Sequence, residues 1–229
     1  MENHFETGIE NLRQKLLVMA SHTEKSVNDA IQSLTQRDHA LALRVKADDD
    51  VIDKCEVEID ELAIQLLTKA PLATNLRLVT VAMKISQDLE RIGDEASKIA
   101  KRARDLSQEP PVKIQLDLPR MAGRALEMLK AALDAFVHHD AAAARAVIPR
   151  DKEVDVLNKE IHAALVEHMV ENPDAISRCL HWMVAAKSLE RIADHATTSP
   201  RMSCISARPR TSATPTSRTS RRPEPRGKG

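Results

Sequence analysis

The chain has 229 residues, enough for a sizeable core in one or two domains, and only Phe5, Phe136 and Trp182 are aromatic. This scarcity of aromatic residues argues against a β-sheet protein, and the abundance of Ala, Leu, Glu and Lys favours helices. Eight basic residues and one acidic residue follow Thr197, so residues 1–197 hold 26 basic and 33 acidic residues and carry a charge of about −7. This charge argues against nucleic-acid binding, because contacts with phosphates depend on Lys and Arg.

Apolar residues recur at intervals of three and four residues through most of this acidic region, as in a helical bundle. Asp38 and Asp140 are predicted N-caps, because a short acceptor side chain can bond the free amides of a first helical turn. Pro149 falls inside one apolar pattern and predicts a kinked or shortened helix. Six helices are predicted in chain order, over residues 6–35, 38–69, 74–106, 119–138, 140–171 and 174–197.

The two halves of this region repeat each other. Asp38 recurs 102 residues later as Asp140, and Leu-Glu-Arg-Ile-Gly-Asp at residues 89–94 recurs 100 residues later as Leu-Glu-Arg-Ile-Ala-Asp. A repeat of this length with three helices predicts an all-α fold of two tandem three-helix bundles with spectrin-like helices. The predicted parts are a first bundle (1–107), a Pro-rich linker (108–118), a second bundle (119–197) and a tail (198–229).

Each predicted bundle carries two acidic pairs with a spacing of four residues. The pairs are Asp49 with Asp53, Glu90 with Asp94, Asp151 with Asp155, and Glu190 with Asp194. This spacing puts both carboxylates on one helical face, about 5–6 Å apart at Cβ, where like charges repel. Two neighbouring helices could thus supply hard oxygen ligands to iron, zinc, manganese or magnesium. The alternative is a solvated acidic face, neutralised by Arg91 and Arg191.

No catalytic motif accompanies the carboxylates. The sequence has no Ser-His-Asp set, no nucleotide-binding glycine loop and no Glu-x-x-His motif of di-iron bundles, so we expect no enzymatic activity. A ferritin-like oxidase would need those histidines, and His195 is only a secondary candidate ligand. We expect a cytoplasmic protein with reduced thiols, since its three cysteines are scattered and it lacks a signal peptide or membrane-spanning stretch.

Residues 89–96 and 189–197 resemble the paired Glu/Asp-x-x-x-Asp signatures of the PhoU family, and Asn-Leu-Arg-Leu-Val at residues 75–79 is also similar to that family. The resemblance covers residues 5–197 and implies two bundles side by side, a homodimer, and multinuclear metal clusters. Iron or zinc is the leading metal, followed by manganese or magnesium. The signature ligands are Glu90, Asp94, Glu190 and Asp194. Their partners from the preceding helices are Asp49, Asp53, Asp151 and Asp155.

The same resemblance implies a negative regulator of phosphate homeostasis. Such a protein couples the phosphate ABC transporter at the inner membrane to a sensor histidine kinase, modulates phosphate uptake, and represses the phosphate-starvation response when phosphate is plentiful. It would be cytoplasmic and reach the membrane only through these partners. The alternative function is a metal-free helical adaptor or scaffold, whose acidic pairs are solvated faces. The metal content of the purified protein separates the two.

The sequence departs from the family pattern after Thr197. The pattern should continue with Asn-Ile-Ala-Glu and more helix, whereas residues 198–229 are rich in Ser, Thr, Pro and Arg, which predicts disorder. Back-translated with GC-rich codons and read in a shifted frame, residues 198–214 yield Asn-Ile-Ala-Glu and a longer helical sequence. We hypothesise a one-base deletion that truncates the last helix and weakens the second metal site. Resequencing the gene tests this, and an intact reading frame refutes it.

Overall fold

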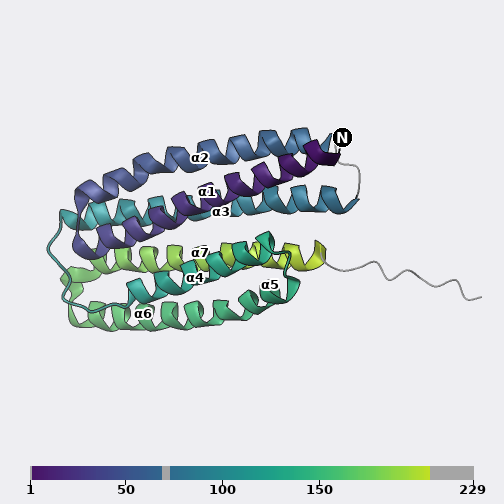
Figure 1. The fold of residues 1–229 in the computed structure, drawn as a ribbon. Coiled ribbons are helices and arrows are strands. Elements are labelled where there is room, and N and C mark those ends of the chain that lie inside the picture. The colour runs from purple at the N-terminus through teal and green to yellow at the C-terminus, as the bar shows by residue number, and fades with distance from the viewer. Residues whose placement is uncertain (1, 69–72, 207–229) are drawn as a thin grey trace, which may run out of the picture.

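The computed structural model describes residues 2–68 and 73–206, which are almost entirely helical and include no strand. The first bundle consists of α1 (Glu2–Gln36), α2 (His39–Leu67) and α3 (Ala73–Ser107). The second consists of α4 (Leu118–Val137), α5 (Ala141–Val147), α6 (Asp151–Glu171) and α7 (Ile176–Ser206). The two bundles lie side by side with their helices roughly aligned (Figure 1). The predicted all-α class of two tandem bundles is confirmed.

The fifth predicted helix is interrupted at Pro149. α5 ends at Val147, a 3-10 turn spans Ile148–Arg150, and α6 begins directly at Asp151. Proline has no backbone N–H and its ring crowds the preceding helical turn, so the chain tightens there and then resumes as a new helix. The predicted kink is confirmed, and it places Asp151 in the first turn of α6.

The last helix differs from the prediction at both ends. A 3-10 turn over Pro173–Ala175 precedes α7, and α7 then continues to Ser206, beyond the end predicted at residue 197. The predicted end is therefore wrong. Extending an established helix by one residue adds a hydrogen bond without a new nucleation cost, so an unfavourable composition need not stop it at once. The disorder predicted for residues 207–229 concerns residues outside those that the structure describes.

Two equivalent turns join α1 to α2 and α4 to α5. Arg37 and His139 have positive φ angles of 58° and 54°, and both follow the end of a helix. The next amide, that of Asp38 or Asp140, bonds the carbonyl oxygen five residues earlier at 2.9 Å in each turn. This is the hydrogen bond that closes a helix around a left-handed residue. The repeat therefore extends to backbone conformation.

The same two aspartates cap the helices that follow. The carboxylate of Asp38 accepts a hydrogen bond from the backbone N–H of Leu41 at 2.9 Å. The carboxylate of Asp140 accepts from Ala142 at 2.8 Å and Ala143 at 2.9 Å. Each aspartate satisfies amides that have no partner within the helix. Both predicted N-caps are confirmed.

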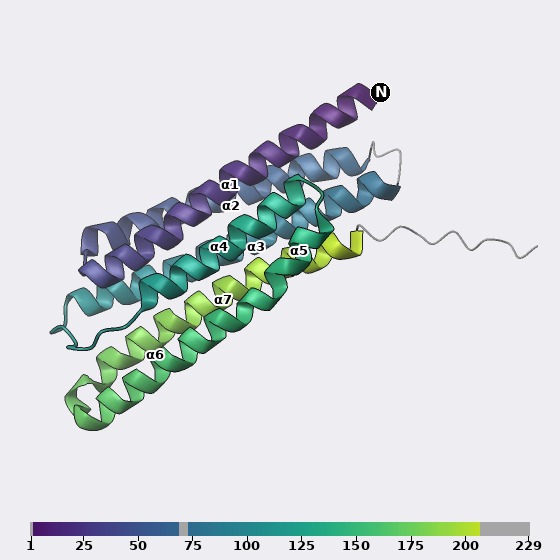
Figure 2. The same cartoon turned by 60° about the horizontal axis from the view of Figure 1, so that its bottom comes forward.

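The signature helices α3 and α7 pack against each other between the bundles, as two views of the fold show (Figures 1 and 2). Leu89 and Leu189 from the repeated signatures are completely buried. Burial of each leucine side chain contributes about 1.5–3 kcal/mol to folding. No helix in the described part of the chain is long and apolar enough to cross a membrane.

Asp38→Ala is expected to lower the free energy of unfolding by about 1 kcal/mol, because the first turn of α2 loses its cap. In a chain of this size that loss corresponds to a fall in Tm of about 2–4 °C. Asp117→Ala is the matched control, since Asp117 occupies the N-cap position of α4 without a side-chain cap bond. Its effect should stay within about 0.5 kcal/mol. Equal losses of Tm in the two variants would contradict this role of Asp38.

Candidate functional site

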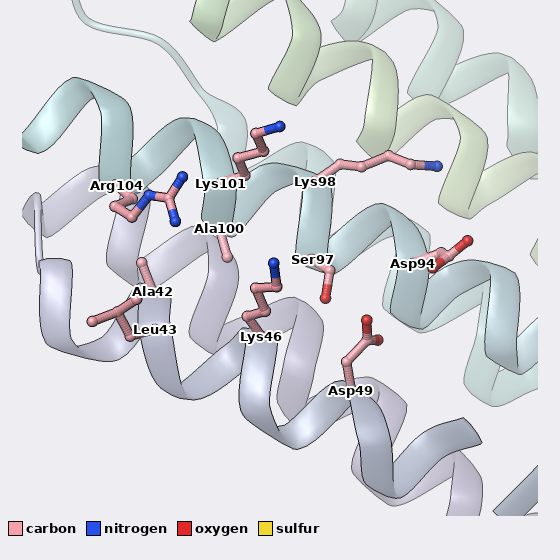
Figure 3. Close-up of a pocket in the computed structure, with 10 residues that line it drawn as sticks. All are labelled: Ala42, Leu43, Lys46, Asp49, Asp94, Ser97, Lys98, Ala100, Lys101 and Arg104. Carbon is pink, nitrogen blue, oxygen red and sulfur yellow. The ribbon is translucent and has the colours of Figure 1, made fainter. Parts of the chain in front are cut away.

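The first acidic set lies where α2 and α3 approach closely. A Cβ atom on Gly93 of α3 would lie 2.9 Å from Ile52 Cδ1 and 3.4 Å from Asp49 Oδ1, both on α2. Glycine therefore permits this close contact. Asp49 and Asp94 lie near one end of a groove between the two helices, and the hydroxyl of Ser97 points toward Asp49 (Figure 3).

The carboxylates of this set raise one another's pKa values. Partial burial raises the pKa of Asp49, and the charges of Asp53 and Asp94 raise it further, while the Ser97 hydroxyl partly offsets the rise. Burial also raises the pKa of Glu90, with additional contributions from Asp94 and Asp53. The structure thus brings the four predicted residues of the first bundle into one electrostatic cluster.

Sequence analysis missed two acidic residues of the same cluster, Glu56 and Asp60. Burial raises the pKa of Glu56, and the charges of Asp60 and Asp53 add to the effect. Oδ1 of Asp60 is buried and has no hydrogen-bond partner among the described residues. Both residues continue the spacing of three and four along α2 from Asp53, so this spacing could have identified them.

The second acidic set is partly neutralised. Burial and the neighbouring Glu190 raise the pKa of Asp194, Lys187 opposes the rise, and Asp155 adds to it. The ammonium of Lys187 forms an ion pair with Glu190 one turn away on α7. The structure therefore brings Asp155, Glu190 and Asp194 together. Asp151 begins α6, and its Oδ1 is buried.

The second set also replaces two carboxylates with other groups. Asn158 and His162 on α6 occupy the positions of Glu56 and Asp60 in the repeat. Oδ1 of Asn158 and Nε2 of His162 are buried without a hydrogen-bond partner in the described part of the chain. Buried polar atoms are usually paired, so these two atoms are suited to a ligand. An amide oxygen and an imidazole nitrogen thus accompany the carboxylates of the second set.

Sequence analysis also predicted that His195 could bind metal and that Arg91 and Arg191 could neutralise the acidic pairs. His195 faces the other bundle, with its Nδ1 3.4 Å from Oδ1 of Asp88 on α3. Arg191 also reaches across, and its Nη1 lies 3.3 Å from Oε1 of Glu95. Arg191 therefore serves the interface between the bundles, whereas Arg91 contributes a minor lowering of the pKa of Glu90.

The donor chemistry of the first set fits a hard cation. Its carboxylates are partly withdrawn from water and repel one another, and a bound cation would relieve that repulsion. The second set offers a carboxylate, an amide and an imidazole, although Lys187 already pairs with Glu190. Among the side chains that the structure describes, no three of His, Cys, Asp or Glu converge closely enough to hold a metal ion.

Comparison with known proteins places both bundles in one family. The family described as the PhoU domain matches residues 16–103 and 118–198. The chain is 41% identical over 198 residues to the phosphate-specific transport system accessory protein PhoU homolog of Pseudomonas aeruginosa, covering 86% of this chain and 82% of that protein. It is 35% identical over 190 residues to homolog 2 of Thermotoga maritima, covering 82% and 81% of the two chains.

Solved structures agree with these matches. The crystal structure of PhoU from Pseudomonas aeruginosa superimposes with a TM-score of 0.84 at 40% identity, covering 88% of this chain and 98% of that chain. PhoU from Streptococcus pneumoniae, titled a phosphate transport system regulatory protein, gives a TM-score of 0.81 at 24% identity and covers 88% and 96% of the two chains. The second likeness supports the fold alone.

Asp49→Asn is expected to raise the Tm of chelator-treated protein at pH 7. The pKa of Asp49 is raised in the folded chain, so ionised Asp49 destabilises the fold above that pKa. The gain should shrink as pH falls through the raised pKa toward the ordinary value of 3.8, where both states become protonated. Thermal unfolding at several pH values measures this difference.

Glu58→Gln on α2 is the control, because the pKa of Glu58 is shifted in the direction opposite to that of Asp49. A hydrogen bond from Lys15 lowers the pKa of Glu58, so its ionised form favours the folded chain above the ordinary value of 4.5. This substitution should leave Tm unchanged or lower it at pH 7. A lower Tm for Asp49→Asn at pH 7 would show that the acidic cluster does not oppose folding.

Proposed function

The chain belongs to the PhoU family, and we propose that it is a negative regulator of phosphate homeostasis that acts with a phosphate ABC transporter. The observation that carries this proposal is the family match, which spans both bundles and includes all four carboxylate pairs. Its relatives in Pseudomonas aeruginosa and Thermotoga maritima are named as accessory proteins of a phosphate-specific transport system. We further propose that the chain couples the transporter to a phosphate-sensing histidine kinase at the inner membrane.

The proposed mechanism is that of an adaptor. Long helices packed through α3 and α7 form a continuous surface, and a partner that binds this surface in only one of its conformations shifts toward that conformation. Its output would be a change in the balance between kinase states, with no chemical conversion. The chain would reach the inner membrane through the transporter.

The proposal includes multinuclear metal clusters, with iron or zinc as the leading metal. Asp49, Asp53, Glu90 and Asp94 would hold the metal of the first bundle, and Asp151, Asp155, Glu190 and Asp194 that of the second. The bound metal would supply positive charge without redox chemistry. It would join α2 to α3 and α6 to α7, and its charge would offset both the burial and the repulsion that raise the pKa values of Asp49 and Asp194.

A metal-free adaptor or scaffold is the second candidate function. The ion pair between Lys187 and Glu190 favours it, because one signature carboxylate is already neutralised without metal. The separation of the other acidic side chains is consistent with a solvated face. In this alternative, the packing of α3 against α7 is sufficient to fix the surface of the chain that binds a partner.

The regulatory role can be tested in a bacterium that lacks its own PhoU protein and carries a reporter of the phosphate-starvation response. Expression of the wild-type chain is expected to restore repression in phosphate-rich medium and leave the reporter active under starvation. Deletion of the transporter in the same strain should abolish the restored repression. A chain that is produced and folded but never restores repression would refute the proposed regulation.

The metal proposal predicts stoichiometric iron, zinc or manganese in protein purified without chelator, measured by elemental mass spectrometry. The double variant Asp94→Asn, Asp194→Asn should lose most of this metal, because each bundle loses a signature ligand. Glu58→Gln is the control, since Glu58 lies on α2 outside the acidic cluster and pairs with Lys15. Absence of metal from the wild type, even after reconstitution, would favour the metal-free adaptor.

A further inference from the structure

A groove between α2 and α3 extends away from the acidic cluster and has a volume of about 310 Å³. This volume lies at the lower end of the range for small-molecule sites, about 300–1,000 Å³. Lys46, Lys101 and Arg104 line the part of the groove farther from Asp94 (Figure 3). We call this part the basic groove. Its cationic side chains come from both helices, so a ligand there would contact α2 and α3 together.

The charges of the basic groove are largely available to a ligand. Neither Lys46 nor Lys101 has a carboxylate within ion-pair distance among the residues that the structure describes. Within the described part of the chain, the partner of Arg104 is the adjacent Asp105, whose Oδ1 is 3.7 Å from Nη2. Lys98 is different, because its ammonium is 3.0 Å from Oε1 of Glu95.

Small residues create the space beneath these cations. Ala42 on α2 and Ala100 on α3 are buried and line the groove. Larger side chains at these positions would fill the gap between the helices, whereas alanine leaves room for a ligand. The long lysine side chains can bend over such a ligand while their aliphatic parts cover the apolar floor.

The basic groove is not a requirement of the bundle fold. The internal repeat places Ile148 at the position of Lys46. A second bundle with the same helical pattern therefore forms without this cation. Since the bundle fold does not require this positive charge, ligand binding is the better explanation for its presence in the first bundle.

We propose that the basic groove binds a phosphate-type oxyanion. Three cations from two helices match a tetrahedral dianion, which can accept hydrogen bonds from several directions at once, and the guanidinium of Arg104 suits paired oxygens. The ligand is inorganic phosphate or the phosphate group of a small monoester, for which the groove also has apolar walls. Asp49 and Asp94 at the opposite end orient the anion toward Lys46 and Arg104 by repulsion.

This inference deepens the proposed function by giving the regulator a direct chemical input, but it rests on the groove alone. A chain that binds no phosphate could still repress the starvation response through its partners. A chain that binds phosphate could equally fail to repress. Binding in vitro and repression in cells therefore distinguish the failure of one proposal from the failure of the other.

The test is calorimetric titration of the chelator-treated full chain with inorganic phosphate and, separately, with glycerol 3-phosphate, at constant ionic strength. We expect saturable binding at one site per chain. Lys46→Gln and Arg104→Gln should each weaken it by about tenfold, because each removes a charge-assisted hydrogen bond. Tighter binding of inorganic phosphate identifies the free ion as the ligand, and tighter binding of the monoester identifies a phosphorylated small molecule.

Arg124→Gln is the matched control. Arg124 also lines a surface groove, but its guanidinium pairs with Glu127 at 2.9 Å and Glu153 at 3.6 Å. This substitution should leave phosphate binding unchanged. Equal weakening in all three variants, or no saturable binding of either phosphate, would overturn the proposal. Binding of a hexaglutamate peptide by a chain that binds neither phosphate would also overturn it and assign the groove to an acidic protein partner.

Discussion

The packing of α3 against α7 is the interaction on which the rest of the structure depends. Both helices contribute to the core of their own bundle and to the contact between bundles, so their orientation sets the position of every other helix. The contact includes buried polar groups. Burial would raise the pKa of Glu95, but hydrogen bonds from Ser188, Lys98 and Arg191 outweigh it and lower the pKa. Ser188 and Arg191 bond this carboxylate from α7, so sliding of the two helices would remove two of its three partners and leave only Lys98 of its own helix.

The acidic clusters lie on the faces of α3 and α7 that are turned toward α2 and α6. Buried leucines on the other faces hold these helices in place, which allows the fold to tolerate repulsion among carboxylates. Functional sites commonly contain groups that oppose folding, and the raised pKa values of Asp49, Glu90 and Asp194 identify such groups here. The acidic clusters therefore oppose folding when they are ionised.

The two bundles share a backbone design but differ in chemistry. Gln87 in the first bundle corresponds to Lys187 in the second, and only the lysine neutralises a signature carboxylate. Glu56 and Asp60 correspond to Asn158 and His162, which changes the type of ligand atom. The region of the basic groove differs as well, because Ile148 stands where the first bundle has Lys46. Repetition thus supplied two equivalent frameworks, and substitutions on their surfaces gave each one different side-chain chemistry.

The sequence by itself determined the helices, the repeat, the caps at Asp38 and Asp140, and the pairing of carboxylates along single helices. These features depend on spacing within a few residues, and helical geometry converts that spacing directly into position. Only the tertiary structure decided that Arg191 and His195 face α3, that Glu56 and Asp60 join the first cluster, and that α7 continues to Ser206. Contacts between helices depend on their relative rotation and register, which follow from packing of the whole core and are not encoded in local spacing.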